Sequence, residues 1–359
     1  MMPITPAAAG DVRSPAISNT PTASSVEVDA NHCMPGKRNP MAANQFVVFS
    51  LPLACLTPWA MNTAPSPIRK INMEASSGSI RFQAYSRPML TTEIQGHVAT
   101  LWLDRPEKLN AMSPEFWDGM PSVMAGLDAD PEVRVIVIAG KGKAFSVGLD
   151  LEAFGPAVAT GTLGSSGGSE ASKRAALLEQ VKSMQRAISA AADASKPVIA
   201  AIHGYCIGGA VDLITACDIR IASEDAIFSV RETKLAMVAD VGTLQRLPKI
   251  IDPGWVAEMA FTGRDITAAE AKDAGLVSRL FATPDDLFKA ATELAESIAA
   301  NSPLTVQGAK KVLRATANMP TDQALDYAAL WSAAFLESDD IKEAMAAFLE
   351  GRDPQFRGE

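Results

Sequence analysis

Apolar positions divide the chain into two parts. Over the first 88 residues they follow no sustained strand or helix period, and Ala, Ser, Thr, Pro and Asn dominate. From Thr91 onward, short β-branched apolar runs alternate with longer segments of helical period. We predict strands at four of these runs, namely Val98–Leu103, Val133–Ile138, Pro197–Ile202 and Ile219–Ala222.

Capping and breaking residues set the expected helix limits. Ser113-Pro114-Glu115 is typical of a helix start, and Pro121 should kink or end that helix. The Gly/Ser-rich segment Gly155–Glu170 predicts a mobile loop, and a long helix should follow over about 171–192. We expect further helices at Gly208–Ala216 and near Trp255–Thr262, Ala268–Ala274, Asp285–Ala300, Pro303–Thr316, Asp322–Leu336 and Ile341–Leu349.

This order of elements predicts an α/β core followed by an α-helical C-terminal part. We place an extension at residues 1–88, the α/β core at 89–290 and the helical region at 291–359. The composition of the extension is not suited to a packed core, and everything after Thr91 is complete without it.

Phe46–Ala60 is an apolar stretch of the extension that follows Lys37 and Arg38. It resembles the hydrophobic part of a signal peptide, but Pro52 and Pro58 interrupt it, and it is too short to cross a membrane. Three interpretations stay open: a targeting segment, a disordered extension, or translated sequence upstream of the true start. We favour a non-folding extension without stable membrane insertion. The expected location is the cytoplasm of a bacterium, or the mitochondrial matrix if the extension includes a transit peptide.

Composition narrows the function classes. The chain is 48% hydrophobic and 20% charged, which predicts a sizeable packed core. Its net charge of -9 argues against nucleic-acid binding. Four cysteines without a CxxC pair and three histidines argue against a disulfide framework, a zinc site or a serine triad. Cys206 and Cys217 lie in apolar surroundings and are expected to be buried thiols of a reducing compartment.

Two glycine-containing turns each follow a predicted strand. Lys141–Leu151 follows the second strand, and Gly208-Gly209 follows the third. Amides at a helix N-terminus are unpaired and carry partial positive charge, and glycines allow close approach. Two such turns could direct the N–H groups of Leu149 and Gly209 at one carbonyl oxygen. The structural alternative is a plain loop with Asp150 as a helix N-cap, and close helix–sheet packing at the glycine pair.

Three acids lie in a segment that is rich in apolar residues. They are Asp212, Glu232 and Asp240. Carboxyl groups in apolar surroundings can transfer protons at neutral pH. Each acid also has a structural interpretation: Asp212 complements a helix dipole, Glu232 pairs with Arg231 or Lys234 at the surface, and Asp240 caps a helix. The residues alone do not decide between these interpretations.

Taken together, several segments resemble the crotonase (enoyl-CoA hydratase/isomerase) superfamily, from about Thr91 to Phe356. These segments are Leu103–Ala111, Phe145–Leu151, Pro197–Leu213, Cys217–Arg220 and Gln245–Pro248. Within the superfamily, the likeness to the Δ3,5-Δ2,4-dienoyl-CoA isomerases is greatest, at Gly208–Arg220, Ala239–Lys249, and Leu325–Tyr327 with Trp331. Ala210 departs from the glycine that is usual in the family's turn and narrows the pocket floor.

The resemblance implies a fold, a substrate class and a site. The fold is a spiral of repeated β-β-α units, with C-terminal helices that build homotrimers, often paired into homohexamers. The substrate is an acyl-CoA thioester, and no metal or separate cofactor is implied. The family's oxyanion hole falls on the amides of Leu149 and Gly209, and its three acids fall on Asp212, Glu232 and Asp240. CoA is expected to lie across Arg105, Lys108, Ala111, Ser146, Val147, Gly148 and Asp150.

The implied reaction converts a 3,5-dienoyl-CoA to a 2,4-dienoyl-CoA in fatty-acid β-oxidation. Glu232 is expected to act at C2 and Asp240 at C6, or the reverse, while Asp212 raises a neighbour's pKa. An enoyl-CoA hydratase, or another crotonase reaction, is the first alternative, although a hydratase would carry glutamate at position 212. An acyl-CoA binder without efficient chemistry is the second. Three acids facing one pocket favour the isomerase, whereas Asp212 or Asp240 turned to solvent favours the alternatives.

Overall fold

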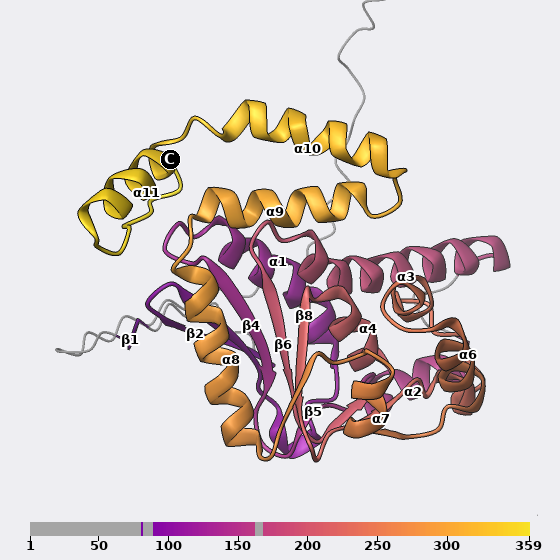
Figure 1. Ribbon diagram of the computed structural model, residues 1–359. Coiled ribbons are helices and arrows are strands. Elements are labelled where there is room, and N and C mark those ends of the chain that lie inside the picture. Colours follow the sequence, from indigo (N-terminus) through magenta and orange to yellow (C-terminus); the bar gives the residue numbers. More distant parts are fainter. Residues whose placement is uncertain (1–79, 82–88, 162–167) are drawn as a thin grey trace, which may run out of the picture. The chain divides into compact units, whose positions relative to one another are not determined.

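The computed structural model describes residues 80–81, 89–161 and 168–359, which form a mixed α/β fold (Figure 1). Most of the predicted extension therefore lies outside the described residues. The larger sheet has seven strands in the order β1-β2-β3-β4-β6-β8-β11; β1, β2 and β3 are antiparallel neighbours, and the pairs from β3 onward are parallel. The strands are β1 Ile80–Arg81, β2 Leu90–Gln95, β3 Val98–Leu103, β4 Val135–Gly140, β6 Val198–Ile202, β8 Ile219–Ser223 and β11 Arg279–Phe281.

A second, four-stranded sheet has the order β10-β9-β7-β5. In each of the strand pairs β4–β5, β6–β7 and β8–β9, the first strand joins the larger sheet and the second joins the smaller one. Strands of successive pairs run parallel. Helices follow the pairs, so the chain winds as a spiral of β-β-α turns, which confirms the predicted fold. The strands of the smaller sheet are β5 Ala144–Ser146, β7 Tyr205–Ile207, β9 Ile227–Ser229 and β10 Ile266–Thr267. The helices that follow the first two pairs are α2 Leu151–Ala159, α3 Glu170–Asp193 and α4 Gly209–Ala216.

The central strands of the larger sheet are buried on both faces. In β4, Val135, Val137 and Ala139 pack with α8 (Pro284–Ala299), whereas Ile136 and Ile138 belong to the core on the opposite face. Figure 1 shows α8 along the sheet. This division at every second residue explains why a nearly continuous apolar run forms a strand with no polar face.

The first long helix differs from the prediction at its proline. Helix α1 (Pro114–Ala129) begins after Ser113, as expected, but Pro121 does not end it. Met120 and Met124, on either side of this proline, are both buried in the core. We infer that this apolar packing outweighs the loss of one helical hydrogen bond.

The prediction of a mobile loop over Gly155–Glu170 is wrong in its first part. Helix α2 continues through Gly155 and Pro156 to Ala159. Its N-cap is Asp150, whose carboxylate accepts hydrogen bonds from two amides of the first turn. Residues 162–167 lie outside the described residues, and α3 begins at Glu170 after its Ser169 cap. The capping carboxylate thus supports a helix that composition alone argues against.

The remaining helices lie near their predicted positions, although their limits move by a few residues. They are α6 Pro253–Thr262, α7 Ala268–Asp273, α9 Pro303–Thr316, α10 Thr321–Phe335 and α11 Asp339–Glu350. The short helix α5, Thr243–Arg246, was not among the predicted helices. Cys206 and Cys217 are buried free thiols, as predicted. Among the described residues, no helix is long and apolar enough to cross a membrane.

The last two helices expose large apolar side chains. Leu325 and Leu330 on α10 are 65% and 71% exposed, and Phe348 and Leu349 on α11 exceed 80%. Such a surface is costly in water and is typical of an interface. Trimer or hexamer formation through this region stays a prediction.

The extension can be tested by truncation. A chain that begins at Met89 should fold with a thermal midpoint close to that of the full chain. It retains the hydrogen bond from the Asp104 amide to the Met89 carbonyl oxygen, and of the described strands it loses the two-residue strand β1. Circular dichroism and size-exclusion chromatography check this, with a chain that begins at Met73 as control. Aggregation of both chains would show that the extension is structural.

Candidate active site

The site lies at the carboxyl ends of three adjacent parallel strands. Leu149 follows β5 by three residues, Gly209 follows β7 by two, and Glu232 follows β9 by three. The strands pair as β5–β7 and β7–β9, all parallel, so their carboxyl ends share one edge of the smaller sheet. Ligands of parallel sheets commonly bind at such an edge.

Two glycines let the first two loops touch. Gly148 has φ +79° and Gly208 has φ +56°, a region that disfavours side chains. A Cβ on Gly148 would lie 2.5 Å from the Ile207 carbonyl oxygen and 3.0 Å from the Gly209 nitrogen. The loops therefore approach at a distance that only glycine at position 148 permits.

The amides of Leu149 and Gly209 are left unpaired by this packing. Met112 fixes both neighbours of Leu149: its amide donates to the Gly148 carbonyl oxygen (2.7 Å), and its carbonyl oxygen accepts from the Asp150 amide (3.2 Å). Within the described residues, neither the Leu149 nor the Gly209 amide donates to a backbone carbonyl. Both residues line a cleft of about 590 Å³. Two such donors can stabilise negative charge on one oxygen.

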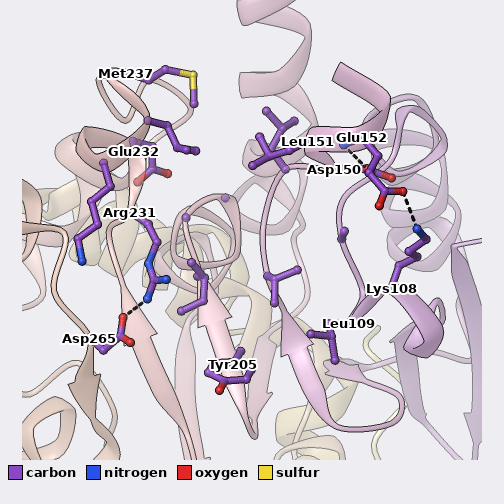
Figure 2. A pocket seen from close by; sticks show the side chains of 18 residues that line it. Lys108, Leu109, Asp150, Leu151, Glu152, Tyr205, Arg231, Glu232, Met237 and Asp265 are labelled. Atoms are coloured by element: carbon purple, nitrogen blue, oxygen red, sulfur yellow. Dashed lines mark hydrogen bonds and ion pairs between the residues drawn. The ribbon is translucent and has the colours of Figure 1, made fainter. Parts of the chain in front are cut away.

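Figure 2 shows the side chains around this cleft. Glu232 and Met237 lie on one side and Leu151 and Glu152 on the other, with Tyr205 lower in the view between them. The predicted residues that line it are Lys108, Ala111, Val147, Leu149, Asp150, Gly209 and Glu232. The prediction missed Leu109, Leu151, Glu152, Tyr205, Ile207, Gly208, Arg231, Lys234, Leu235, Met237 and Asp265. The lining also includes two ion pairs, Lys108–Glu152 (2.5 Å) and Arg231–Asp265.

Of the three predicted catalytic acids, Glu232 is the one that lines the cleft. Its Oε1 lies 3.3 Å from the position that a Cβ on Gly208 would occupy, and its Oε2 is buried without a hydrogen-bond partner among the described residues. Burial, and then the negative charge of Asp212, raise the pKa of Glu232 to about 7. The surface ion pair considered for Glu232 is not formed, because Arg231 pairs with Asp265 instead.

Asp212 lies in the first turn of α4 and is fully buried. Its Oδ1 accepts a hydrogen bond from the Thr243 amide (2.5 Å), while its Oδ2 has no partner within the described residues. Burial raises the pKa of Asp212 to about 6, although Thr243 and Arg246 oppose this rise. The carboxyl does not line the cleft, but its charge acts on Glu232.

Asp240 stands apart from the cleft. It is exposed on the single chain and is not among the lining residues. Partial burial still raises the pKa of its carboxyl, and its charge contributes to the raised pKa of Glu232. The structural alternative for Asp240, a helix cap, is not formed, because α5 begins at Thr243 and the carboxylate that accepts from its first amide is Asp212.

Three of the predicted CoA contacts shape the loops rather than line the cleft. Arg105 forms an ion pair with Asp150 (2.5 Å), which holds the pKa of that carboxyl below its usual range. The Ser146 hydroxyl donates to the Asn110 carbonyl oxygen (2.7 Å) and accepts from the Gly148 amide (3.1 Å). Arg105, Ser146 and Gly148 therefore position the residues that do face the cleft.

Leu149 and Gly209, whose amides are unpaired, thus line the same cleft as Glu232, whose carboxyl has a near-neutral pKa. Amides of this kind polarise a carbonyl group, and such a carboxyl can accept a proton from the adjacent carbon. In the described residues, no cluster of His, Cys, Asp and Glu side chains suits a metal ion. The arrangement is chemically suited to proton transfer beside a carbonyl group.

Comparison with known proteins identifies the family. Residues 93–359 match the family described as Enoyl-CoA hydratase/isomerase, and the chain belongs to this family. It is 47% identical, over 71% of this chain and 91% of the relative, to the peroxisomal Delta(3,5)-Delta(2,4)-dienoyl-CoA isomerase of Arabidopsis thaliana. It is 39% identical to the mitochondrial protein of the same name from Dictyostelium discoideum, over 80% of this chain and 96% of that relative. The crystal structure of an enoyl-CoA hydratase from Bacillus anthracis is similar, with 31% identity, a TM-score of 0.67, and coverage of 76% of this chain and 100% of that one.

The raised pKa values predict a pH-dependent stability. A carboxyl whose pKa is raised on folding stabilises the fold below its unfolded pKa, and this contribution is lost as pH rises through the folded pKa. For Glu232 that window extends from 4.5 to about 7. Glu232→Gln should therefore be more stable than wild type at pH 8, by on the order of 1–3 kcal/mol.

Urea unfolding at pH 4.5 and pH 8 measures this difference, which should nearly vanish at the lower pH. Glu152→Gln is the matched control, since the Glu152 side chain is 78% exposed, and it should show no such pH dependence. Equal stability of Glu232→Gln and wild type at pH 8 would mean that the Glu232 carboxyl carries no desolvation cost.

Proposed function

We propose that this protein isomerises 3,5-dienoyl-CoA to 2,4-dienoyl-CoA. The observation that carries the proposal is the carboxyl of Glu232, with a pKa raised to about 7, beside the Gly208–Gly209 turn and the buried Asp212. The aspartate at position 212 also argues against a hydratase with two glutamates. Relatives that are 47% and 39% identical carry the name of this activity.

The proposed reaction moves one proton and leaves the atom count unchanged. The thioester oxygen accepts hydrogen bonds from the amides of Leu149 and Gly209. The Glu232 carboxylate removes a proton from C2, and the electron pair spreads through the conjugated chain from the thioester oxygen to C6. A protonated carboxyl delivers a proton to C6, which leaves double bonds at C2 and C4. Glu232 suits C2 because it lies beside the turn that carries the Gly209 amide.

Asp240 is the proposed donor at C6. The step needs this carboxyl in its protonated form, and partial burial raises its pKa in that direction. Because Asp240 is exposed on the single chain, the step requires the assembled protein or a bound acyl chain to enclose it. We propose a homotrimer or homohexamer built through the apolar surface of α10 and α11. The reverse assignment, with Asp240 at C2 and Glu232 at C6, remains the alternative within this mechanism.

CoA is proposed to enter past Lys108 and Ala111, which line the cleft next to the Leu149 amide. CoA is part of the substrate, and the mechanism uses no other cofactor. For the location, the bacterial cytoplasm and the mitochondrial matrix stay the two proposals. The relatives named as peroxisomal and mitochondrial support an organelle matrix if the source is a eukaryote.

One observation favours an enoyl-CoA hydratase as the second candidate. Asp240 does not line the cleft of the single chain, and an acid that stayed turned to solvent in the assembled protein would not serve C6. The similar structure from Bacillus anthracis carries the name enoyl-CoA hydratase. The third candidate is an acyl-CoA binder without efficient chemistry, which would use the amides and the cleft to bind the thioester but would turn over neither substrate. Assay of the purified protein on 3,5-dienoyl-CoA and 2-enoyl-CoA side by side separates the three candidates.

The roles of the acids can be separated by amide substitutions. Asp240→Asn should reduce isomerisation by about 10²-fold or more, while exchange of the C2 hydrogen with D2O survives better because Glu232 remains. Glu232→Gln should suppress both reactions. If instead Glu232→Gln keeps C2 exchange and Asp240→Asn suppresses both reactions, Asp240 acts at C2 and Glu232 at C6. Full isomerisation by Asp240→Asn, or faster hydration than isomerisation by wild type, would support the hydratase.

The oxyanion-hole assignment can be tested at the backbone. Leu149→Pro removes the N–H group and should lower turnover about 10²–10³-fold while acyl-CoA binding partly persists. Leu149→Ala keeps the amide and is the matched control, with a much smaller effect. Thermal unfolding confirms that both variants fold. Unchanged turnover in Leu149→Pro would remove the Leu149 amide from the mechanism.

A further inference from the structure

The indole of Trp117, on α1, reaches the backbone that holds each of the two unpaired amides. Trp117 is 4% exposed and is not among the residues that line the cleft. Its Nε1 donates a hydrogen bond to the Met112 carbonyl oxygen (3.1 Å). The far edge of the ring, at Cη2, lies 3.7 Å from the position that a Cβ on Gly209 would occupy. One buried side chain therefore spans from the support of the Leu149 amide to the turn that carries the Gly209 amide.

The backbone of Met112 is the support of the Leu149 amide. Met112 and Leu149 form an isolated parallel bridge, in which the Met112 amide donates to the Gly148 carbonyl oxygen and the Met112 carbonyl oxygen accepts from the Asp150 amide. The oxygen that accepts from Asp150 also accepts from the Trp117 indole. A carbonyl oxygen has two lone pairs, so these two donors together fix its direction. The indole bond therefore helps to set where the bridge holds the Leu149 N–H group.

Gly209 is packed against the same two side chains. A Cβ on Gly209 would lie 3.2 Å from the Met112 sulfur, in addition to its approach to the indole. Met112 is fully buried and Trp117 nearly so, and both belong to the main apolar core. Close-packed interiors transmit small displacements, because few voids exist to absorb them. A shift of the indole would therefore move the Gly209 turn as well as the bridge to Leu149.

We propose that Trp117 is a positioning residue that sets the spacing of the Leu149 and Gly209 amides around the thioester oxygen. A buried indole needs an acceptor for its N–H group, but that need alone does not explain an acceptor shared with the backbone beside Leu149. The proposal rests on the proposed function in one respect, namely that a thioester oxygen lies between the two amides. Trp117 acts through Met112 and Gly209, and its side chain does not line the cleft.

The carbonyl stretching frequency of a bound thioester reports the two amides directly, because hydrogen bonds to the oxygen weaken the C=O bond. The probe is hexanoyl-CoA with an isotope label on the carbonyl carbon, since a saturated chain has no double bond to isomerise or hydrate. Infrared difference spectra should show that wild type lowers the frequency of the bound probe relative to the free probe in water. Trp117→Phe removes the N–H group and shortens the ring, and it should retain less than about half of that shift.

Turnover should change in the same variant. Trp117→Phe should lower kcat about 10- to 30-fold and leave KM within about 2-fold, because the two amides stabilise the enolate more than they stabilise the bound thioester. A defect of the fold alone would lower the active fraction without moving the carbonyl frequency of the probe that does bind.

Leu127→Val is the matched control. Leu127 is fully buried on the same helix, about 15 Å further along its axis, so this variant disturbs the core away from the two amides. It should keep the full carbonyl shift and a kcat within about 2-fold of wild type. If Trp117→Phe does not fold, Trp117→benzothienylalanine replaces the N–H group by sulfur in a ring system of the same outline and provides the comparison.

Three results would overturn the proposal. The first is a full carbonyl shift in a folded variant that lacks the indole N–H group, whatever its kcat. The second is an equal loss of the shift in Leu127→Val. The third is a probe that binds to wild type without any lowering of its carbonyl frequency.

The saturated probe separates this proposal from the proposed function. If wild type hydrates 2-enoyl-CoA, or turns over neither substrate, the proposed isomerisation fails, and the carbonyl frequency of bound hexanoyl-CoA still decides the role of Trp117. If wild type isomerises dienes and Trp117→Phe keeps the full carbonyl shift, the proposed function stands and the role of Trp117 fails.

Discussion

The close approach of the β5–α2 loop and the β7–α4 turn is the contact on which the rest of the site depends. The two loops meet only because Gly148 has no side chain, since a Cβ there would collide with the Ile207 carbonyl oxygen. The parallel pairing of β5 and β7 brings both loops to the same edge, and Met112 bonds to the residues on either side of Leu149. The amides of Leu149 and Gly209 stay unpaired because their neighbours already hold the backbone. The donors are therefore in place before any ligand arrives, which is the condition for effective charge stabilisation.

The two buried acids, by contrast, lower the stability of the fold. Asp212 and Glu232 each keep one oxygen buried without a partner in the described residues, and burial raises both pKa values toward neutrality. A more stable arrangement would place hydrogen-bond donors on these oxygens and lower both values. Proton transfer near pH 7 needs the opposite, because a carboxyl with an ordinary pKa is too weak a base. The seven-stranded sheet and its two buried faces supply the stability that this pair of carboxyls removes.

Much of this arrangement could be predicted from the chain, and the reasons for the failures are physical. Long apolar runs such as Val133–Ile138 and capped helix starts such as Ser113 determine local structure strongly, so the main strands and helices appear in the pattern. Strands of three residues, such as β5, β7 and β9, are too short to show a period. Helix α2 was missed because its N-cap outweighs a composition typical of loops. The cleft residues Arg231 and Asp265 are 34 positions apart, and no local pattern indicates that they pair. The exposure of Asp240 depends on how its loop is anchored to α3, which the sequence around Asp240 does not reveal.

The spiral gives each turn of the fold one part of the site. The first β-β-α turn provides the Leu149 amide, the second provides the Gly209 amide and Asp212, and the third provides Glu232. No contiguous fragment of the chain shorter than these three turns contains the whole set. A local opening of any one turn, such as the events that amide hydrogen exchange detects, would therefore dismantle the site even while the other turns stay folded. With the site proposed above, catalysis requires the three turns to be closed at the same moment, so that partly open or proteolytically nicked chains should be inactive.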